Sequence, residues 1–353
     1  MVYPADTSVQ SLARIRRQRI LPMHGEILVG VGSRVESAQV VGRTNLPGGF
    51  RIVAVARLLG VSTPEVERYL QVKLGDTVRQ GDVIARASGL LGRSVRSPID
   101  GIVTARGGGR VLIEAQPIPF ELRAYIPGTV SRVVNTLSVE IETAGALIRG
   151  SWGSGGESTG VLKVVGRGAA GQLSVRAIDS TCHGSVLVSA VTLEGEALQR
   201  AEDVEARGLV TGSLCSDLVS FAEQLSFPIV VTEGIGDVPM ARAILDLLKT
   251  SEGKAASLSG QVASPWSTMR PEVIIPRPDR RVPTDRTAGE GGIRVGTQVR
   301  IVRPPHSGTV GRVVGLPRYA RRIETGARAR CADVEIGEDA PVSVPLVNLD
   351  VVA

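Results

Sequence analysis

Residues 70–86 read LQVKLGDTVRQGDVIAR, and residues 27–43 read ILVGVGSRVESAQVVGR. The two stretches align without a gap, and most of their apolar positions match in kind. Each copy predicts a strand, a turn that contains glycine, a short strand and a second turn. A repeat of this kind indicates a duplicated structural unit. Five positions are identical: Val29 and Val72, Gly32 and Gly75, Val35 and Val78, Val40 and Val83, and Arg43 and Arg86.

A second pair of short segments extends the repeat. Residues 99–104 read IDGIVT and residues 126–131 read IPGTVS, and each predicts a glycine turn that leads into a strand. The chain between the copies allows one short helix over residues 64–70. We therefore expect residues 20–160 to form a duplicated all-β region. Its end, residues 150–160, is rich in glycine and serine and predicts a flexible junction.

The repeat carries a resemblance to a known fold. Residues 72–85 and 97–103 resemble the two halves of the biotinyl/lipoyl barrel-sandwich hybrid, and the likeness covers residues 68–115 with a weaker echo in residues 20–60. Carrier members of this family hold a modified lysine on the hairpin between the halves. Here that hairpin, residues 88–93, reads SGLLGR, and Arg93 cannot replace the lysine because its side chain stays protonated. The resemblance therefore implies a hybrid without a cofactor, similar to the structural and docking modules of membrane-fusion adaptors and of ion-pumping redox complexes.

Residues 161–250 predict an α/β domain. Apolar strand-like runs alternate with segments of helical spacing, and this order is typical of a small parallel sheet with right-handed crossovers. Residues 251–292 are rich in Ser, Pro, Gly and Arg and predict a linker with one strand at 273–275. The predicted strands of the α/β domain are residues 186–190, 209–213 and 228–234, and its predicted helices are residues 194–207, a stretch that ends at 225, and residues 238–249.

Residues 293–353 predict a second β module. Residues 295–302 and 308–314 resemble the first strands of a KOW-type SH3-like barrel, and residues 334–336 and 342–351 would supply the closing strands. The resemblance implies contact with RNA or protein. The expected fold is therefore multidomain and mainly β, with a duplicated barrel-sandwich hybrid, one α/β domain with a small parallel sheet, and a C-terminal SH3-like barrel.

Composition narrows the class of protein. A hydrophobic content of 42% and a charged content of 22% belong to globular chains, and the net charge of +6 permits an anionic partner. The chain has no apolar run of the ~18–20 residues that a spanning helix needs, so integral membrane insertion is not expected. Three cysteines without a CxxC pair favour reduced thiols and a cytoplasmic protein. Residues 1–19 predict a basic arm or short helix in solvent, with Arg14, Arg16, Arg17 and Arg19.

The ends of the predicted parallel strands supply one candidate site. In an open parallel sheet, ligands bind outside the carboxyl ends of the strands, where small and hydroxyl-bearing residues let an anion approach the following helices. The alternative is that Ser213 and Asp237 are N-caps and the glycines are turns. The candidate anion-binding residues are Thr211, Gly212, Ser213, Thr232, Glu233, Gly234 and Gly236.

The C-terminal module supplies a second candidate site. Its loops are rich in arginine and contain one tyrosine, which suits contact with phosphate groups of a nucleic acid. Nearby acidic residues offset this field, and a solvated loop with surface ion pairs is the alternative. The candidate nucleic-acid-binding residues are Arg312, Arg318, Tyr319, Arg321 and Arg322.

Catalytic, cofactor and metal sites are not expected. Cys182 and His183 are adjacent, but a catalytic dyad needs convergence in space with a third, orienting group. His24, His183 and His306 make no metal-binding spacing with the cysteines. We therefore expect a non-enzymatic scaffold that docks protein partners. The alternatives are a factor associated with RNA, the ribosome or transcription, a peripheral subunit of a membrane redox or transport assembly, and an enzyme in which Ser213, Glu233 and Cys182 share one pocket.

Overall fold

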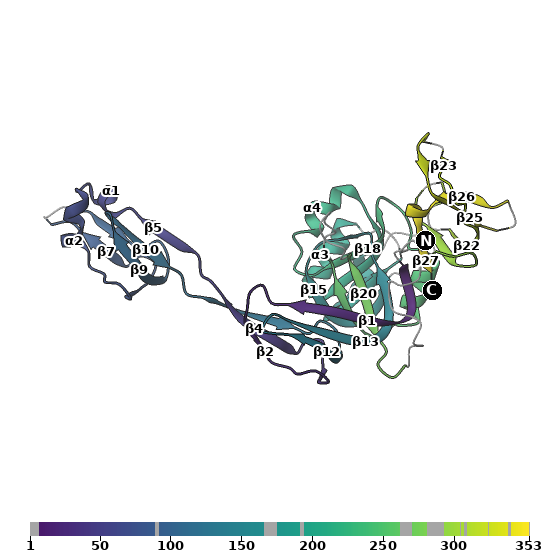
Figure 1. Ribbon diagram of the computed structural model, residues 1–353, viewed down its shortest axis with the longest axis horizontal. Helices are drawn as coiled ribbons and strands as arrows, with labels where there is room; N and C mark the ends of the chain where they lie inside the picture. Colours follow the sequence, from purple (N-terminus) through teal and green to yellow (C-terminus); the bar gives the residue numbers. More distant parts are fainter. Residues whose placement is uncertain are drawn as a thin grey trace.

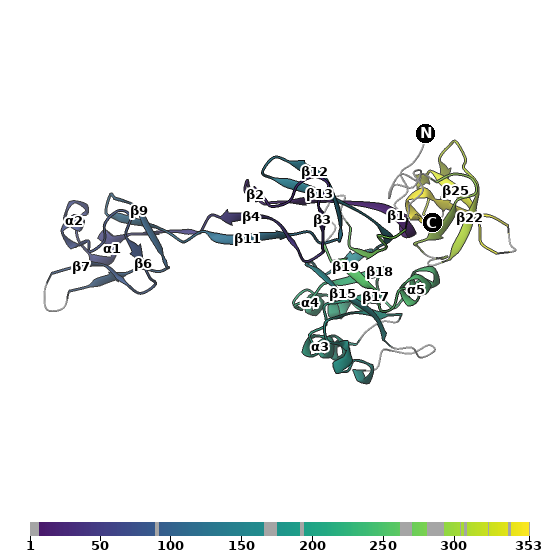
Figure 2. The same ribbon diagram turned by 90° about the horizontal axis from the view of Figure 1, so that it is seen from below.

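The computed structural model describes residues 7–88, 92–165, 175–190, 194–261, 270–280, 293–303, 305–306, 309–323, 325–337 and 340–352. The protein is mainly β, as predicted, with 47% strand and 15% helix. Figure 1 shows an elongated molecule in which a small module stands away from a larger body at the end of a narrow two-stranded ribbon. Figure 2 shows the same separation from a second direction.

The described part of the N-terminal segment is a strand, so the prediction of a basic arm or helix in solvent is wrong for residues 7–19. Strand β1 (Thr7–Ile20) pairs antiparallel with β13 (Ser138–Arg149) along most of its length. Its side chains alternate in the period of two that a strand requires, with Ala13 and Ile15 buried on one face. The arginines pair with carboxylates on other strands of the sheet: Arg16 with Glu142, Arg17 with Glu272 and Arg19 with Glu157.

The duplicated region forms two modules. The proximal module (residues 21–46 and 118–142) adjoins the body, and the distal module (residues 50–114) lies at the far end of the ribbon. The proximal module contains β2 (Glu26–Ile27), β3 (Arg34–Val35), β4 (Val40–Leu46), β11 (Ile118–Arg123), β12 (Gly128–Val134) and part of β13. The distal module contains β5 (Phe50–Val53), α1 (Val55–Leu59), η1 (Thr63–Glu65), α2 (Val66–Tyr69), β6 (Thr77–Val78), β7 (Val83–Arg86), β8 (Ser94–Arg96), β9 (Gly101–Gly107) and β10 (Arg110–Glu114).

The two modules repeat one hydrogen-bond pattern, so the duplication predicted from the sequence is present in the structure. Gly32 N–H donates to Val130 O at 2.8 Å, and the matching Gly75 N–H donates to Val103 O at 2.8 Å. Both glycines have positive φ, 87° and 88°, which favours glycine in this turn. The register of β4 against β11 recurs in β7 against β8: Val40–Arg123 and Val83–Arg96, Gly42–Leu122 and Ala85–Val95, Arg43–Glu121 and Arg86–Ser94.

The modules are nested rather than consecutive. Strands β4 and β11 of the proximal module correspond to the β7–β8 hairpin of the distal module. Residues 89–91, at the tip of the distal hairpin, lie outside the described residues. At the matching place in the proximal module, the chain instead continues into the whole distal module. Each module has its own core, built around Ile141 in the proximal module and around Ile113 in the distal one.

The α/β domain contains the predicted parallel sheet. Strands β15, β16, β17 and β18 are parallel neighbours in this order, and each predicted strand and helix is present. The boundary expected at residue 160 is wrong, because β15 crosses it. The elements are β14 (Trp152–Gly153), β15 (Glu157–Val165), η2 (Val175–Ala177), η3 (Ser180–Cys182), β16 (Ser185–Ser189), α3 (Gly195–Asp203), β17 (Gly208–Leu214), η4 (Ser216–Leu218), α4 (Val219–Ala222), β18 (Ile229–Ile235) and α5 (Arg242–Lys249).

The segment expected to be a linker contributes two central strands. β19 (Ala255–Ser259) pairs with β15, and β20 (Glu272–Pro276) pairs with β19 and with β13. The strand predicted at 273–275 is therefore confirmed, but the linker prediction is wrong for the described residues on either side of 262–269. Val273, Ile274 and Ile275 are fully buried, because both faces of this strand are covered.

The C-terminal module is a small antiparallel unit in which β21, β22, β25 and β26 follow one another and the last strand returns beside the first. Val299, Val313 and Val334 lie in its core. Thr7 and Val9 of β1 pair with its last strand, so the two ends of the described chain meet in one sheet. The elements are β21 (Gln298–Ile301), β22 (Val310–Gly315), β23 (Arg321–Arg322), β24 (Arg328–Ala329), β25 (Cys331–Glu335), β26 (Val342–Pro345), η5 (Leu346–Asn348) and β27 (Leu349–Val352).

One sheet of 16 strands connects these parts. Its order is β14-β18-β17-β16-β15-β19-β20-β13-β1-β27-β21-β22-β25-β26, with β12 paired to β13 and β3. The body is therefore joined by backbone hydrogen bonds from the α/β domain, through β13 and β1, to the C-terminal module. The distal module keeps a separate four-stranded sheet, β5-β10-β9-β6.

Candidate functional sites

The predicted anion-binding residues do meet at the carboxyl ends of β17 and β18, but they bind other parts of the protein. Ser213 Oγ accepts a hydrogen bond from Val238 N–H at 2.9 Å. Thr211 and Thr232 are buried, and the Thr232 hydroxyl lies 3.3 Å from Thr211 O. Gly234, near the end of β18, and Gly236, just after it, have φ of 126° and 141°, values that favour glycine.

Gly212 is needed for packing. A Cβ at this position would lie 2.4 Å from the backbone nitrogen of Met240, so the chain after β18 passes directly over the glycine. Met240 N–H in turn donates to Ala190 O at 3.0 Å, at the end of β16. The close approach that glycine permits here is therefore used by the protein's own backbone.

Glu233 forms a buried ion pair with the C-terminal module. Its carboxylate accepts hydrogen bonds from Arg300 Nη1 at 2.6 and 2.7 Å and from Ala241 N–H at 3.0 Å. Arg300 Nη2 also donates to Asp350 at 3.1 Å, and the Arg300 and Glu233 side chains are only 3% and 4% exposed. One guanidinium is shared by two carboxylates, so these three side chains carry a net charge of −1, which disfavours an added anion. This edge of the sheet is therefore an interface between two parts of the body, and its arrangement does not support the predicted anion site.

The enzyme alternative is not supported by the positions of its residues. Cys182 comes just before β16, at the amino ends of the parallel strands, whereas Ser213 and Glu233 lie at the carboxyl ends of β17 and β18. Cys182 is fully buried, and the His183 ring contacts Val204 O at 3.2 Å. Cys182 therefore lies at the opposite end of the parallel strands from Ser213 and Glu233.

A glycine-rich pattern follows β15 in the sequence. Residues 166–171 read GRGAAG, which matches the G-x-G-x-x-G pattern and follows β15 in the chain, although the residues themselves lie outside the described ones. A dinucleotide-binding loop of this pattern opens a helix. The described residues between β15 and β16 form only the short turns η2 and η3. The described part of the chain therefore does not support a dinucleotide-binding site at this loop.

A second buried cluster joins β1 to the rest of the sheet. Arg17 pairs with Glu272 through two hydrogen bonds, and the Tyr125 hydroxyl donates to the same carboxylate at 3.4 Å. Arg19 lies over the Tyr125 ring at 5.3 Å and pairs with Glu157. Burial, and next to it the Glu272 carboxylate, raises the pKa of Tyr125 well above the ordinary tyrosine value.

The raised pKa of Tyr125 predicts a loss of stability at alkaline pH. Below about pH 10 the phenol is protonated in both folded and unfolded chains, so its stabilising contribution is fully present. As the pH rises further, the unfolded chain loses this proton while the folded chain keeps it, and the free energy of unfolding falls. We expect the wild type to lose more stability than Tyr125→Phe between about pH 9 and 11, measured by urea unfolding. Tyr319→Phe, at an exposed position, is the control, and equal pH slopes for wild type and Tyr125→Phe would contradict the expectation.

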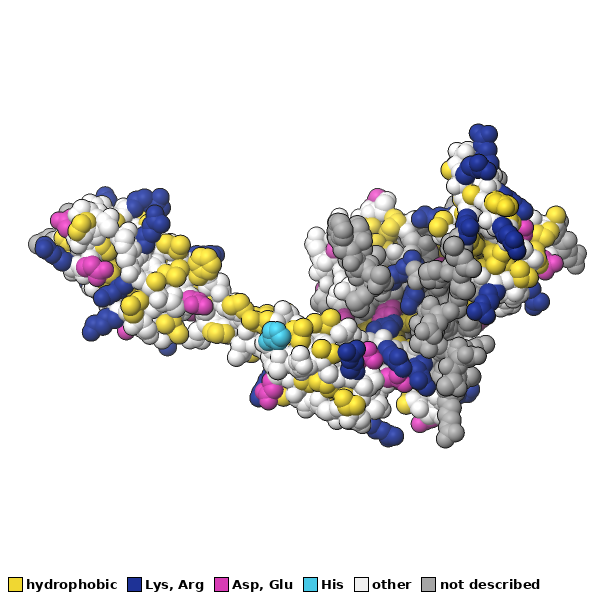
Figure 3. Space-filling view, in the orientation of Figure 1, with side chains coloured by type: hydrophobic (Ala, Val, Ile, Leu, Met, Phe, Trp, Pro, Cys, Tyr) yellow, Lys and Arg dark blue, Asp and Glu magenta, His cyan; other side chains and the backbone are white. Residues whose placement is uncertain are grey.

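The predicted nucleic-acid-binding residues lie on the exposed outer part of the C-terminal module. Arg312, Arg318 and Arg322 are exposed, and Tyr319 is 83% exposed. Arg321 is already paired with Asp333 at 2.8 Å. Figure 3 shows Lys and Arg side chains gathered on the projecting hairpin of this module.

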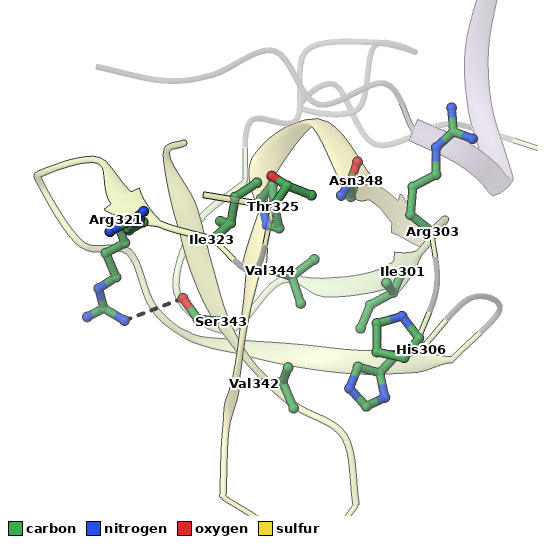
Figure 4. A pocket seen from close by; sticks show the side chains of 13 residues that line it. Ile301, Arg303, His306, Arg321, Ile323, Thr325, Val342, Ser343, Val344 and Asn348 are labelled. Atoms are coloured by element: carbon green, nitrogen blue, oxygen red, sulfur yellow. Dashed lines mark hydrogen bonds between the residues drawn. The ribbon is translucent and has the colours of Figure 1, made fainter. Parts of the chain in front are cut away.

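A cavity of about 440 Å³ lies beside this hairpin and was not predicted from the sequence. Arg321 and Arg322 line it, but Arg312, Arg318 and Tyr319 do not. Figure 4 shows that its walls come from the end of β21 and the loop that follows, from the β23 hairpin, and from β26. Because these segments are far apart in the sequence, only the arginine density of the region could have pointed to the cavity.

The described residues contain no helix that is long and apolar enough to cross a membrane. They also contain no group of three or more His, Cys, Asp or Glu side chains placed to hold a metal ion. A comparison with models of known protein families finds no match, and no curated protein matches the sequence.

Proposed function

We propose that this protein is a non-enzymatic docking scaffold that holds a binding module at a distance from its body. The observation that carries the proposal is the nesting, which places a second module with its own core at the end of a two-stranded ribbon. In this proposal both modules are barrel-sandwich hybrids without a carrier lysine. The C-terminal module is an SH3-like barrel, which is supported by the short η5 turn before a last strand that pairs with the first.

The distal module presents an apolar face that suits a protein partner. Phe50 and Ile52 on the edge strand β5 are 62% and 56% exposed, and Ile102 on β9 is 37% exposed. The register places Phe50 and Ile102 on either side of Glu114, and Ile52 beside Leu112, so these apolar side chains share the outer face of the sheet. Exposed apolar groups that cluster in this way are typical of interaction surfaces. Figure 3 shows hydrophobic side chains gathered on this module.

Excision of the distal module tests the proposal. Leu46 faces Ile118 across the ribbon, so an Asn-Gly turn can join them after removal of residues 47–117. The proximal core contains no residue of the excised segment, and we expect the shortened protein to keep its fold. Its partners, identified by isolation of the native full-length protein, should fall at least about tenfold in yield, because the module that holds them is absent.

A point-variant pair sharpens the same test. Phe50→Ser with Ile52→Ser should reduce partner recovery as strongly as the excision does. The control is Leu58→Ser, which changes a 48% exposed side chain on helix α1 rather than on the sheet face. Full partner recovery by both the excised protein and the double variant would overturn the docking role of this module.

A further inference from the structure

The cavity in the C-terminal module has an apolar floor. Ile301 and Val344 are 2% and 5% exposed, and Ile323 and Val342 are half-buried beside them. All four side chains are aliphatic and lie around the hollow in Figure 4. Binding of an apolar group to this floor is favourable, because it removes apolar surface from water. The floor contains no Phe, Tyr or Trp ring on which a nucleic-acid base could stack, since Tyr319 is outside the cavity, and the imidazole of His306 lies at the rim.

The rim of the cavity is cationic. Arg303 and Arg322 are exposed and have no carboxylate within salt-bridge distance among the described residues, whereas Arg321 is held by Asp333. His306 lies on the same side as Arg303. No Asp or Glu lines the cavity within the described part of the chain. The charge of the rim is therefore complementary to an anionic ligand.

One wall of the cavity is a free sheet edge. β26 is the last strand of the sheet, and among the described strands it pairs only with β25. Leu346 N–H donates to Arg330 O, and hydrogen-bonded positions alternate along an antiparallel pair. The backbone N–H and C=O of Ser343 therefore point to the open edge. An extended peptide can add a strand to such an edge.

We propose that this cavity binds an extended acidic peptide segment of a partner protein. An apolar side chain of the peptide occupies the aliphatic floor, carboxylates on either side of it pair with Arg303 and Arg322, and the peptide backbone lies along Ser343. Acid groups give the segment its orientation and the apolar anchor gives it affinity. The inference rests on the proposed docking function and adds a second surface to it, at the opposite end of the molecule from the distal module.

Selection from a random peptide library tests the inference on the full-length protein. Phage that display random ten-residue peptides should yield a consensus in which Asp or Glu flanks an aliphatic or aromatic residue. A fluorescein-labelled peptide of that consensus should bind at least ten times more weakly to Arg303→Glu/Arg322→Glu, by fluorescence anisotropy. Arg294→Glu is the matched control, because Arg294 is an exposed arginine of the same module that does not line the cavity, and its affinity should stay within twofold.

Three outcomes would overturn the inference. The selection could yield no acidic consensus, the double variant could bind the peptide as the wild type does, or a 12-nucleotide single-stranded RNA could bind the cavity arginines and displace the peptide. The last result would identify the cavity as a nucleic-acid site. None of these outcomes bears on the distal module, whose role is tested by partner recovery with the shortened protein. The two proposals can therefore fail independently.

Discussion

Replacement of Arg300 by methionine is expected to lower the free energy of unfolding by about 3–5 kcal/mol. Arg300 donates to Glu233 and to Asp350, and these carboxylates are 4% and 14% exposed. Without the guanidinium, both acids stay buried without a compensating charge. Because the pair joins β18 to β21, the loss should fall on the contact between the α/β domain and the C-terminal module. Urea unfolding followed by circular dichroism measures it.

Arg321→Met is the matched control for this prediction. Arg321 also belongs to the C-terminal module, but it pairs with a single carboxylate, Asp333, and its side chain is 50% exposed. An exposed pair of this kind contributes less than about 1 kcal/mol. If Arg300→Met were as mild as Arg321→Met, the Glu233–Arg300 pair would not be what holds the two parts together.

Gly128→Ala is expected to destabilise the proximal module by about 3 kcal/mol. A Cβ at Gly128 would lie 2.2 Å from Glu142 O, and a Cβ at the equivalent Gly101 would lie 2.2 Å from Glu114 O. In both modules the obstacle is backbone of the paired strand, which cannot move away without breaking the ladder. Gly101→Ala should therefore cause the same loss of unfolding free energy, but in the distal module. Chemical unfolding gives the magnitude and hydrogen exchange gives the location.

Gly49→Ala supplies the control for the glycine pair. A Cβ at Gly49 has no atom within 4 Å, and its φ is outside the range that favours glycine. This change should stay within about 0.5 kcal/mol. Equal acceleration of exchange in both modules by Gly101→Ala would contradict the independence of their cores.

The repeat was predictable because the same turn recurs at a constant spacing. Gly32 and Gly75 occupy equivalent turns with nearly equal φ, so the sequence match reports a real match of backbone. The nesting was harder to predict, since a match between two segments does not say which strands pair. Strand β4 pairs with β2 on one side, but its other partner, β11, lies beyond the distal module at residues 118–123, and only the register reveals this.

The errors in prediction share one physical cause. Arg17 was assigned to a basic arm in solvent and Arg300 was not singled out. In the structure Arg17 is largely buried against Glu272 and Arg300 is buried against Glu233, which lie 255 and 67 residues away in the sequence. A charged side chain must be either hydrated or paired with an opposite charge, and the sequence alone does not show which of the two applies. Strand β19 was missed for a related reason, because a short strand gains its stability from the strands on both sides of it rather than from its own composition.

The nested insertion also affects how the two-stranded ribbon transmits force between the distal module and the body. The chain crosses between the modules twice, and Ala115 N–H donates to Gly49 O at 2.8 Å where the two crossings run side by side. A single connecting segment would let the distal module swivel freely about its bonds. Two segments that are hydrogen-bonded to each other resist such torsion. A rotation imposed on the distal module by a bound partner is therefore transmitted through the ribbon to the body.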